Sequence, residues 1–244
     1  MDKHTLKWGA KFVTTLVKCT PALKQAKKIK ESGTWEEYKY LVDKELYNWL
    51  NPLIEMAGVT FKVKGKEKIP QNEPIIYTPN HSGAFDIPAI ILNTPKPPIF
   101  IAKKELGALP LIKDWMGVMD CVFVDRNNKD KARSSLHDAI EMVKNGRSIV
   151  VFPEGTRSKN GELGVFKGGA MKIAMETGAR VVPVLLEGTR ECLEETGNIT
   201  PGEITVTFLE PINTKGLTKD EFFKMPEQIR QLIIDERKKQ SDEA

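Results

Sequence analysis

Apolar and polar residues follow two different periods along this chain, and the change from one to the other falls near residue 59. Before that point, large apolar residues recur every three or four positions, which predicts helices over 4–19 and 34–57. After it, short β-branched runs alternate with helical patterns. The predicted strands are 59–64, 75–78, 98–102, 121–125, 148–152, 181–186 and 203–209, and the predicted helices are about 86–94, 107–117, 129–145, 167–177 and 218–240.

Alternating strands and helices are typical of an α/β fold. We expect a central, mostly parallel or mixed sheet of about seven strands flanked by helices. Residues 59–244 would form this single domain, and residues 1–58 would precede it as an amphipathic helical module that associates with a membrane. In such sheets, sites form where loops leave the carboxyl ends of the strands, so the residues after each predicted strand are the candidates for chemistry.

The first predicted helix separates aromatic and aliphatic residues from lysines. At about 100° per residue, the apolar and basic side chains fall on opposite arcs. Such a helix is typical of the interface of a bilayer, although amphipathic helices also pack on their own protein. We expect membrane contact from Lys3, Lys7, Trp8, Lys11, Phe12, Leu16 and Lys18. For the second helix, which opens with a capping box at Thr34 and Glu37, membrane and core remain equal alternatives.

Charge is distributed unevenly along the chain. The formal net charge is +4, yet residues 1–30 contain eight lysines and one acidic residue, so the remainder is slightly acidic. This asymmetry favours contact with a membrane or with nucleic acid. We expect no nucleic-acid binding, because the later strands offer no stacking platform among their basic residues.

Several classes of protein are excluded by what the sequence lacks. The three cysteines are widely spaced and form no paired motif, so we expect neither a disulfide framework nor a zinc site. Because the chain has three histidines, we expect no other metal site. No apolar run reaches about 18 residues without a charge, as an ordinary membrane-spanning helix would need. Lysines also interrupt the stretch that a signal peptide would require. We therefore expect a protein attached to the cytoplasmic face of the cell membrane at the interface.

A histidine and an aspartate follow the second predicted strand. His81 and Asp86 cannot share one face of an ideal helix, but a bend at Gly83 would bring the carboxylate back to the imidazole. An aspartate that accepts the imidazole N–H fixes the tautomer and strengthens the other nitrogen as a base. The alternative is a loop histidine followed by a plain helix cap.

Other strand ends carry groups suited to an anion. After the strand at 148–152 come Glu154, Gly155, Thr156 and Arg157, in which the glycine permits close backbone approach and the guanidinium suits a phosphate. Glu154 would hold Arg157 or bind a substrate hydroxyl. The alternative is a turn with an exposed ion pair. Two further strand ends add Lys103 and Arg126.

Taken together, these segments resemble the glycerolipid acyltransferase family, specifically the bacterial lysophosphatidic acid acyltransferases. The resemblance covers about residues 59–215, and four motif blocks stand in the family's order. They are His81-x4-Asp86, Gly117 through Arg126 preceded by Ala102 to Leu106, Phe152 to Ser158, and Val182 to Val184. Phe85 replaces the Ser or Thr that many relatives carry before the aspartate.

The resemblance implies an acyl transfer in phospholipid biosynthesis that needs no cofactor. The enzyme would move a fatty acyl chain from a thioester of acyl carrier protein or coenzyme A to the sn-2 hydroxyl of lysophosphatidic acid, giving phosphatidic acid. His81 would be the general base and Asp86 its orienting partner. The loop 154–157, with Lys103 and Arg126, would hold the phosphate. The backbone amides of Gly83 and Ala84 would be oxyanion donors.

Two alternatives remain open. One keeps the chemistry and changes the acceptor to another lysophospholipid or to glycerol 3-phosphate. The other is a non-catalytic module that binds phospholipid or membrane through the same anion pocket.

Overall fold

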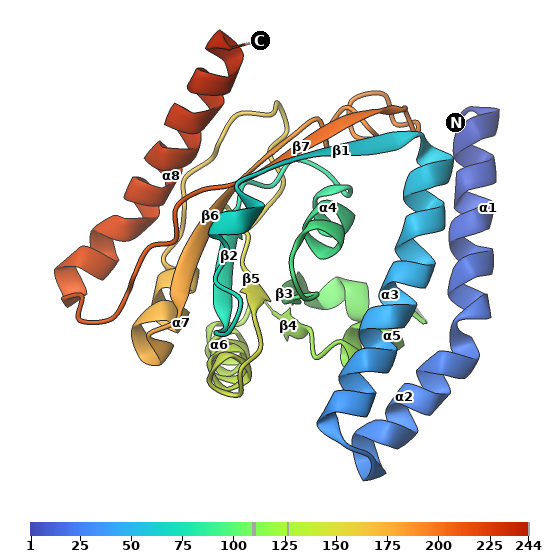
Figure 1. Cartoon of the computed structure of the whole chain (residues 1–244), viewed down its shortest axis with the longest axis horizontal. Coiled ribbons are helices and arrows are strands. Elements are labelled where there is room, and N and C mark those ends of the chain that lie inside the picture. The colour runs from blue at the N-terminus through green and yellow to red at the C-terminus, as the bar shows by residue number, and fades with distance from the viewer. Residues whose placement is uncertain (109–110, 126, 244) are drawn as a thin grey trace.

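Seven strands form one mixed sheet in the computed structural model, which describes residues 1–108, 111–125 and 127–243 (Figure 1). Their order across the sheet is β1-β7-β6-β2-β5-β3-β4. The strands are β1 (Val59–Lys64), β2 (Ile75–Pro79), β3 (Ile99–Lys103), β4 (Val122–Val124), β5 (Ile149–Val150), β6 (Arg180–Glu187) and β7 (Gly202–Phe208). Neighbouring strands are parallel except β6 and β7, which are antiparallel. The prediction of a seven-stranded, mostly parallel or mixed sheet is confirmed.

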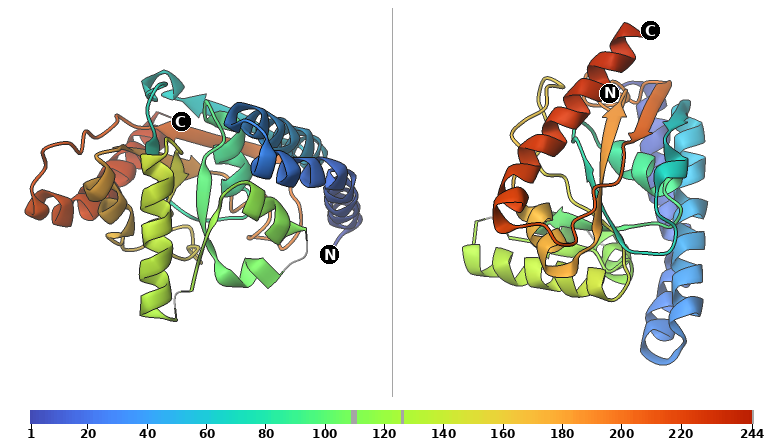
Figure 2. Two further views of the ribbon diagram at one scale, coloured as in Figure 1. Left: turned by 90° about the horizontal axis from the view of Figure 1, so that it is seen from below. Right: turned by 60° about the vertical axis from the view of Figure 1, so that its left-hand side comes forward.

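Helices cover both faces of the sheet. They are α1 (Lys3–Lys18), α2 (Thr20–Ser32), α3 (Trp35–Ala57), α4 (Asp86–Asn93), α5 (Ile112–Val118), α6 (Lys129–Lys144), α7 (Gly169–Thr177) and α8 (Lys219–Asp242), with 3-10 turns η1 (Lys66–Lys68) and η2 (Lys104–Ala108). Figure 2 shows α8 on the side of the sheet opposite α1 to α3. The helix predicted over 107–117 is shorter in the structure. Residues 107 and 108 belong to the 3-10 turn η2, and α5 begins at Ile112.

The sheet has a hydrophobic core on each face, and successive side chains of a strand point alternately into one core and the other. In β2, Ile75 and Tyr77 belong to the core shared with α1 to α5, whereas Ile76 belongs to the core shared with α6, α7 and α8. This follows from the two-residue period of a strand. Because both faces are covered, the strands read as nearly continuous apolar runs in the sequence.

Local signals in the sequence set the ends of the N-terminal helices. Pro21 stands in the first turn of α2, where its missing N–H costs little, so α2 directly follows α1. The capping box of Thr34 and Glu37 begins α3. Gly58 ends it in the left-handed region at φ 68°.

The aromatic face of α1 is turned toward the protein, which differs from the predicted membrane contact of Trp8, Phe12 and Leu16. Trp8 donates its Nε1–H to the carbonyl of Leu53 at 2.8 Å, and Leu16 is buried. Phe12 packs edge-on against Trp49, with ring centroids 5.3 Å apart. The prediction erred because amphipathicity marks a buried face without indicating whether protein or lipid buries it.

A second apolar group on α1 stays exposed. Leu6, Val13 and Val17 have more than half of their surface accessible, at 53%, 58% and 52%. The lysines at positions 3, 7 and 18 are exposed as well, and Lys11 is half-buried. Among the described residues, no helix is long and apolar enough to cross a bilayer.

Helix α3 packs on the protein core, which answers the alternative left open for it. Its residues Tyr38, Val42 and Leu46 are buried. Helix α2 is attached to α5 by an ion pair of 2.6 Å between Lys27 and Asp114. The division of the chain at residue 58 into a separate module and a domain stays a prediction.

Candidate active site

His81 and Asp86 meet at the carboxyl end of β2. The imidazole Nδ1 lies 2.6 Å from Asp86 Oδ2. A turn closed by the Asp86 amide on the Gly83 carbonyl brings the carboxylate back, as the bend at Gly83 predicted. The same oxygen accepts the amides of Ser82 at 2.8 Å and Gly83 at 3.0 Å, and Asp86 is fully buried as the first residue of α4.

This arrangement determines which nitrogen of His81 can act on a ligand. A neutral imidazole whose Nδ1–H points at the carboxylate carries its lone pair on Nε2. The ring is held further by stacking on Phe152, with centroids 3.9 Å apart and planes at 22°. With 16% of its side chain accessible, His81 is held in one orientation at the surface of a cavity.

Glu154 organises the loop around His81. Its Oε1 accepts the backbone amide of His81 at 2.8 Å, and its Oε2 accepts the amide of Gly164 at 3.0 Å. The side chain is buried, and both oxygens are engaged by backbone groups. The sequence predicted that Glu154 holds Arg157 and helps to bind the phosphate. The structure instead pairs Arg157 with another carboxylate, and buried Glu154, held by two backbone amides, is not among the residues that line the cavity beside His81.

Glu194 is the partner of Arg157 that sequence reasoning missed. Its Oε1 accepts Arg157 Nη1 at 3.1 Å and the backbone amide of Ala84 at 2.8 Å. Burial raises the pKa of this carboxyl above its ordinary range. Glu194 thus connects the histidine loop to the arginine loop. It stands in an irregular loop after β6, and no motif marks it in the sequence.

Two glycines have steric reasons to be glycine. A Cβ on Gly83 would lie 2.7 Å from the carbonyl oxygen of Thr189 and 2.8 Å from Oε2 of Glu194. Gly155 has φ 73°, and a Cβ there would lie 2.8 Å from the ammonium of Lys167. Gly83 therefore permits the close approach of the Thr189 backbone, whereas Gly155 is favoured by its left-handed φ, since the Lys167 side chain could move aside.

The amides expected to be oxyanion donors are already occupied. The Gly83 amide donates to Asp86 and the Ala84 amide donates to Glu194. A backbone N–H has one hydrogen to donate. That expectation is therefore wrong for the present conformation of the loop.

The described cations that were predicted for this site, Lys103 and Arg157, are more exposed than His81. Lys103, the last residue of β3, is exposed and 3.6 Å from Glu105. Arg157 is half-exposed at the same cavity. Arg126, also predicted for this site, lies outside the residues that the structure describes. In the described ranges, no three His, Cys, Asp or Glu side chains group as metal ligands would.

A cavity of about 610 Å³ opens beside His81, within the range typical of ligand pockets. Its walls are apolar and come from α1, α3, α4 and α5, including the aromatic rings of Trp8 and Phe12. Thr156, Arg157 and Lys103 join the lining together with His81. The cavity thus combines a long apolar wall, one base and two cations.

Glu154→Gln tests whether Glu154 positions His81. The NH₂ group of the new glutamine would face one of the two backbone N–H groups that Glu154 now accepts. We therefore expect the free energy of unfolding to fall by about 1–3 kcal/mol and activity by about 10- to 100-fold. The loss should appear in kcat. An increase in KM for a phosphorylated acceptor with unchanged kcat would instead indicate phosphate binding. The exposed Glu203→Gln serves as the control.

The chain resembles known proteins in both sequence and structure. Residues 60–202 match the acyltransferase family model. The 1-acyl-sn-glycerol-3-phosphate acyltransferase of Borreliella burgdorferi is 37% identical over 134 residues, which is 55% of this chain and 54% of that protein. The protein of the same name from Saccharomyces cerevisiae is 34% identical over 186 residues, 74% of this chain and 60% of that protein. The chain thus spans little more than half the length of these two relatives.

One solved structure matches nearly the whole chain. The crystal structure of the 1-acyl-sn-glycerophosphate (LPA) acyltransferase PlsC from Thermotoga maritima superposes with a TM-score of 0.82 at 27% identity, covering 97% of this chain and 96% of that one. The sequence match, the fold and the paired histidine and aspartate agree. The chain belongs to the acyltransferase family.

Proposed function

We propose that this chain is a 1-acyl-sn-glycerol-3-phosphate acyltransferase, which converts lysophosphatidic acid to phosphatidic acid. The observation that carries the proposal is the oriented imidazole of His81 at the wall of an apolar cavity that also contains Arg157. A fatty acyl chain suits the apolar wall, and a phosphate monoester suits the cation. The names of the relatives support the same acceptor.

The proposed mechanism uses His81 as base and then as acid. Nε2 takes the proton of the sn-2 hydroxyl while that oxygen attacks the thioester carbonyl. When the tetrahedral intermediate collapses, the carbon–sulfur bond breaks and the imidazolium returns the proton to the departing thiol. Buried Asp86 stabilises the imidazolium and holds its orientation. No covalent acyl-enzyme is required, because both substrates are bound side by side.

Arg157, Lys103 and Arg126 are proposed to bind the acceptor phosphate. Glu194 holds Arg157 at the edge of the cavity through an ion pair of 3.1 Å, and half of the arginine side chain stays accessible to a ligand. Gly155 and Thr156 form the turn from which Arg157 projects. The acyl donor is a thioester of acyl carrier protein or coenzyme A, and no cofactor takes part.

Release of free thiol by the purified full chain tests the proposal. We expect turnover with lysophosphatidic acid to exceed that with glycerol 3-phosphate or a choline lysophospholipid at least tenfold, because only lysophosphatidic acid combines an acyl chain with a phosphate monoester. Graded acyl-coenzyme A and acyl-carrier-protein donors in the same assay identify the donor. Equal turnover of glycerol 3-phosphate would favour a different acceptor. No thiol release with any acceptor would favour a non-catalytic lipid-binding module.

We further propose that α1 attaches the enzyme to the cytoplasmic face of the cell membrane at the interface. Leu6, Val13 and Val17 are exposed on a helix that also carries exposed Lys3, Lys7 and Lys18. Exposed apolar side chains next to lysines suit an anionic bilayer surface.

Replacing these apolar residues tests the attachment without removing a helix from the core. We expect Leu6→Ser/Val13→Ser/Val17→Ser to weaken binding to anionic vesicles at least tenfold. Each replacement removes apolar surface whose burial in the bilayer would contribute about 1 kcal/mol or more to the binding free energy. Flotation measures the bound fraction. The matched control, Val165→Ser/Phe223→Ser/Leu232→Ser, changes exposed apolar residues elsewhere and should float like the wild type. Equal flotation of both variants would reject this role of α1.

A further inference from the structure

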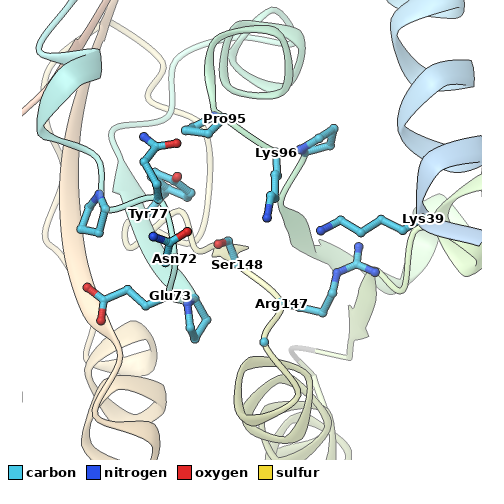
Figure 3. A pocket seen from close by; sticks show the side chains of 13 residues that line it. Lys39, Asn72, Glu73, Tyr77, Pro95, Lys96, Arg147 and Ser148 are labelled. Atoms are coloured by element: carbon cyan, nitrogen blue, oxygen red, sulfur yellow. The ribbon is translucent and has the colours of Figure 1, made fainter. Parts of the chain in front are cut away.

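A second cavity, of about 280 Å³, lies at the opposite end of the sheet from His81. It is enclosed by the loops 70–74, 95–97 and 146–148 and by the start of α3 (Figure 3). Tyr77, in the middle of β2, also lines it. His81 follows the other end of β2. At about 3.3 Å per residue, the two sites are on the order of 20 Å apart.

Three cationic side chains approach one another in this cavity (Figure 3). Lys39 comes from α3, Lys96 from the loop after α4, and Arg147 from the residue pair before β5. In the part of the chain that the structure describes, neither lysine has a hydrogen-bond or ion-pair partner. Arg147 is buried and is fixed by Asp120 Oδ2 at 3.0 Å and by the Met119 carbonyl at 3.3 Å.

Nearby acidic groups offset this positive charge only in part, because Glu73 and Asp120 are shared with Arg180 and Lys30, which lie outside the cavity lining. Glu73 is engaged by Arg180 at 3.0 Å. Asp120 is shared between Arg147 and Lys30. Burial raises the pKa of Asp43 to about 6, against the effect of the neighbouring cations. Burial, followed by Lys96 and Arg147, lowers the pKa of Lys39, against the opposing effect of Asp43. An anion in the cavity would relieve this repulsion.

The polar walls add neutral donors and rigidity. Ser148 Oγ accepts the amide of Ile75 at 3.1 Å, so its hydroxyl hydrogen can donate to a ligand. Asn72 adds an amide side chain to the lining (Figure 3). The loops 70–74 and 95–97 each begin and end with proline, which limits their freedom before a ligand binds.

We propose that this cavity is a binding site for a phosphate group, distinct from the acyl-transfer site. Two ammonium groups, one guanidinium and a hydroxyl converge in a recess that is large enough for a phosphate and a small attached moiety. Two sources can supply this chemistry, a free phosphate compound or the headgroup of a phospholipid. The site does not depend on the proposed catalytic function.

Hydrogen exchange of the full chain in the presence of inorganic phosphate or pyrophosphate tests the site. We expect protection of residues 70–74, 95–97 and 146–148, resolved from any protection of residues 154–158, which include Arg157 of the first cavity. In the Lys39→Gln/Lys96→Gln variant, the concentration of phosphate or pyrophosphate that protects the three loops of the second cavity from exchange should rise at least tenfold. Protection of residues 154–158 should stay unchanged. The control Lys62→Gln/Lys215→Gln removes two exposed lysines elsewhere and should behave as the wild type.

A second arm distinguishes the sources of the phosphate. Protection by inorganic phosphate or pyrophosphate identifies a free compound as sufficient. Protection only by vesicles that contain phosphatidic acid, compared with pure phosphatidylcholine vesicles, identifies a lipid headgroup. No protection of the three loops by any probe, or equal protection in the double variant, would overturn the proposal. Lys96→Gln alone, at an exposed position, repeats the test if the double variant fails to fold.

Discussion

His81→Ala is expected to lower kcat for acyl transfer by about 10³-fold or more, because it removes the group that we propose as the base for the hydroxyl proton. Nε2 is the ring nitrogen left for substrate once Nδ1 is engaged by Asp86 at 2.6 Å. Alanine offers no group that could take its place at the cavity wall. Thiol release with saturating lysophosphatidic acid and acyl thioester measures the effect.

The fold should tolerate this change. Asp86 keeps the amides of Ser82 and Gly83 as hydrogen-bond donors after the imidazole is removed. We therefore expect the free energy of unfolding to stay within about 1–2 kcal/mol of the wild-type value. His137→Ala, at an exposed position on α6, is the matched control and should retain full activity. Turnover near the wild-type rate in His81→Ala would refute the assignment of His81 as the base.

Asp86→Asn is the second large effect, with an expected loss in kcat of about 10²- to 10⁴-fold. The substitution changes almost no volume but removes the buried negative charge that stabilises the imidazolium. If the amide oxygen keeps the place of Oδ2, the new NH₂ occupies the place of Oδ1, which has no partner among the described residues. If the amide is reversed, its NH₂ faces Nδ1 and moves the ring proton to Nε2, so the base is lost.

The two orientations can be separated by measurement. Nitrogen chemical shifts of the His81 ring report its tautomer, and activity reports the consequence. Asp138→Asn, exposed on α6, should leave both unchanged. The N-cap of α4 is Phe85 and not Asp86, so the alternative of a plain helix cap is wrong. An Asp86→Asn protein with kcat within threefold of the wild type would show that Asp86 serves only to hold the loop amides of Ser82 and Gly83.

The strands were predictable because each is short, β-branched and bounded by turn residues. All seven predicted runs became strands, but β4 is shortened to Val122–Val124 and β5 is shortened most, to Ile149 and Val150. Val151 still donates its amide to the Tyr77 carbonyl of β2 at 3.0 Å. The chain then leaves the sheet at Phe152, whose ring stacks on His81, and Pro153 has no N–H for a ladder. The end of this strand was therefore decided by the site that it supports.

The partners of charged side chains were predicted less well than the strands and helices. Sequence proximity suggested that Glu154 holds Arg157, but the structure gives that role to Glu194, 37 residues further along the chain. Glu154 instead accepts backbone amides from two loops. A carboxylate can satisfy an arginine or an amide equally well, and only the path of the backbone decides which donor is within reach.

By itself, the sequence determined the alternation of strands and helices, the cap residues, and the strand ends that deliver His81, Asp86 and Arg157. These depend on local periods and on single residues such as Gly58, so short stretches of chain carry the information. Tertiary structure decided which surface buries the aromatic face of α1, which carboxylate holds Arg157, and that Lys39, Lys96 and Arg147 meet at one cavity. Those outcomes depend on contacts between distant segments, which no local pattern encodes.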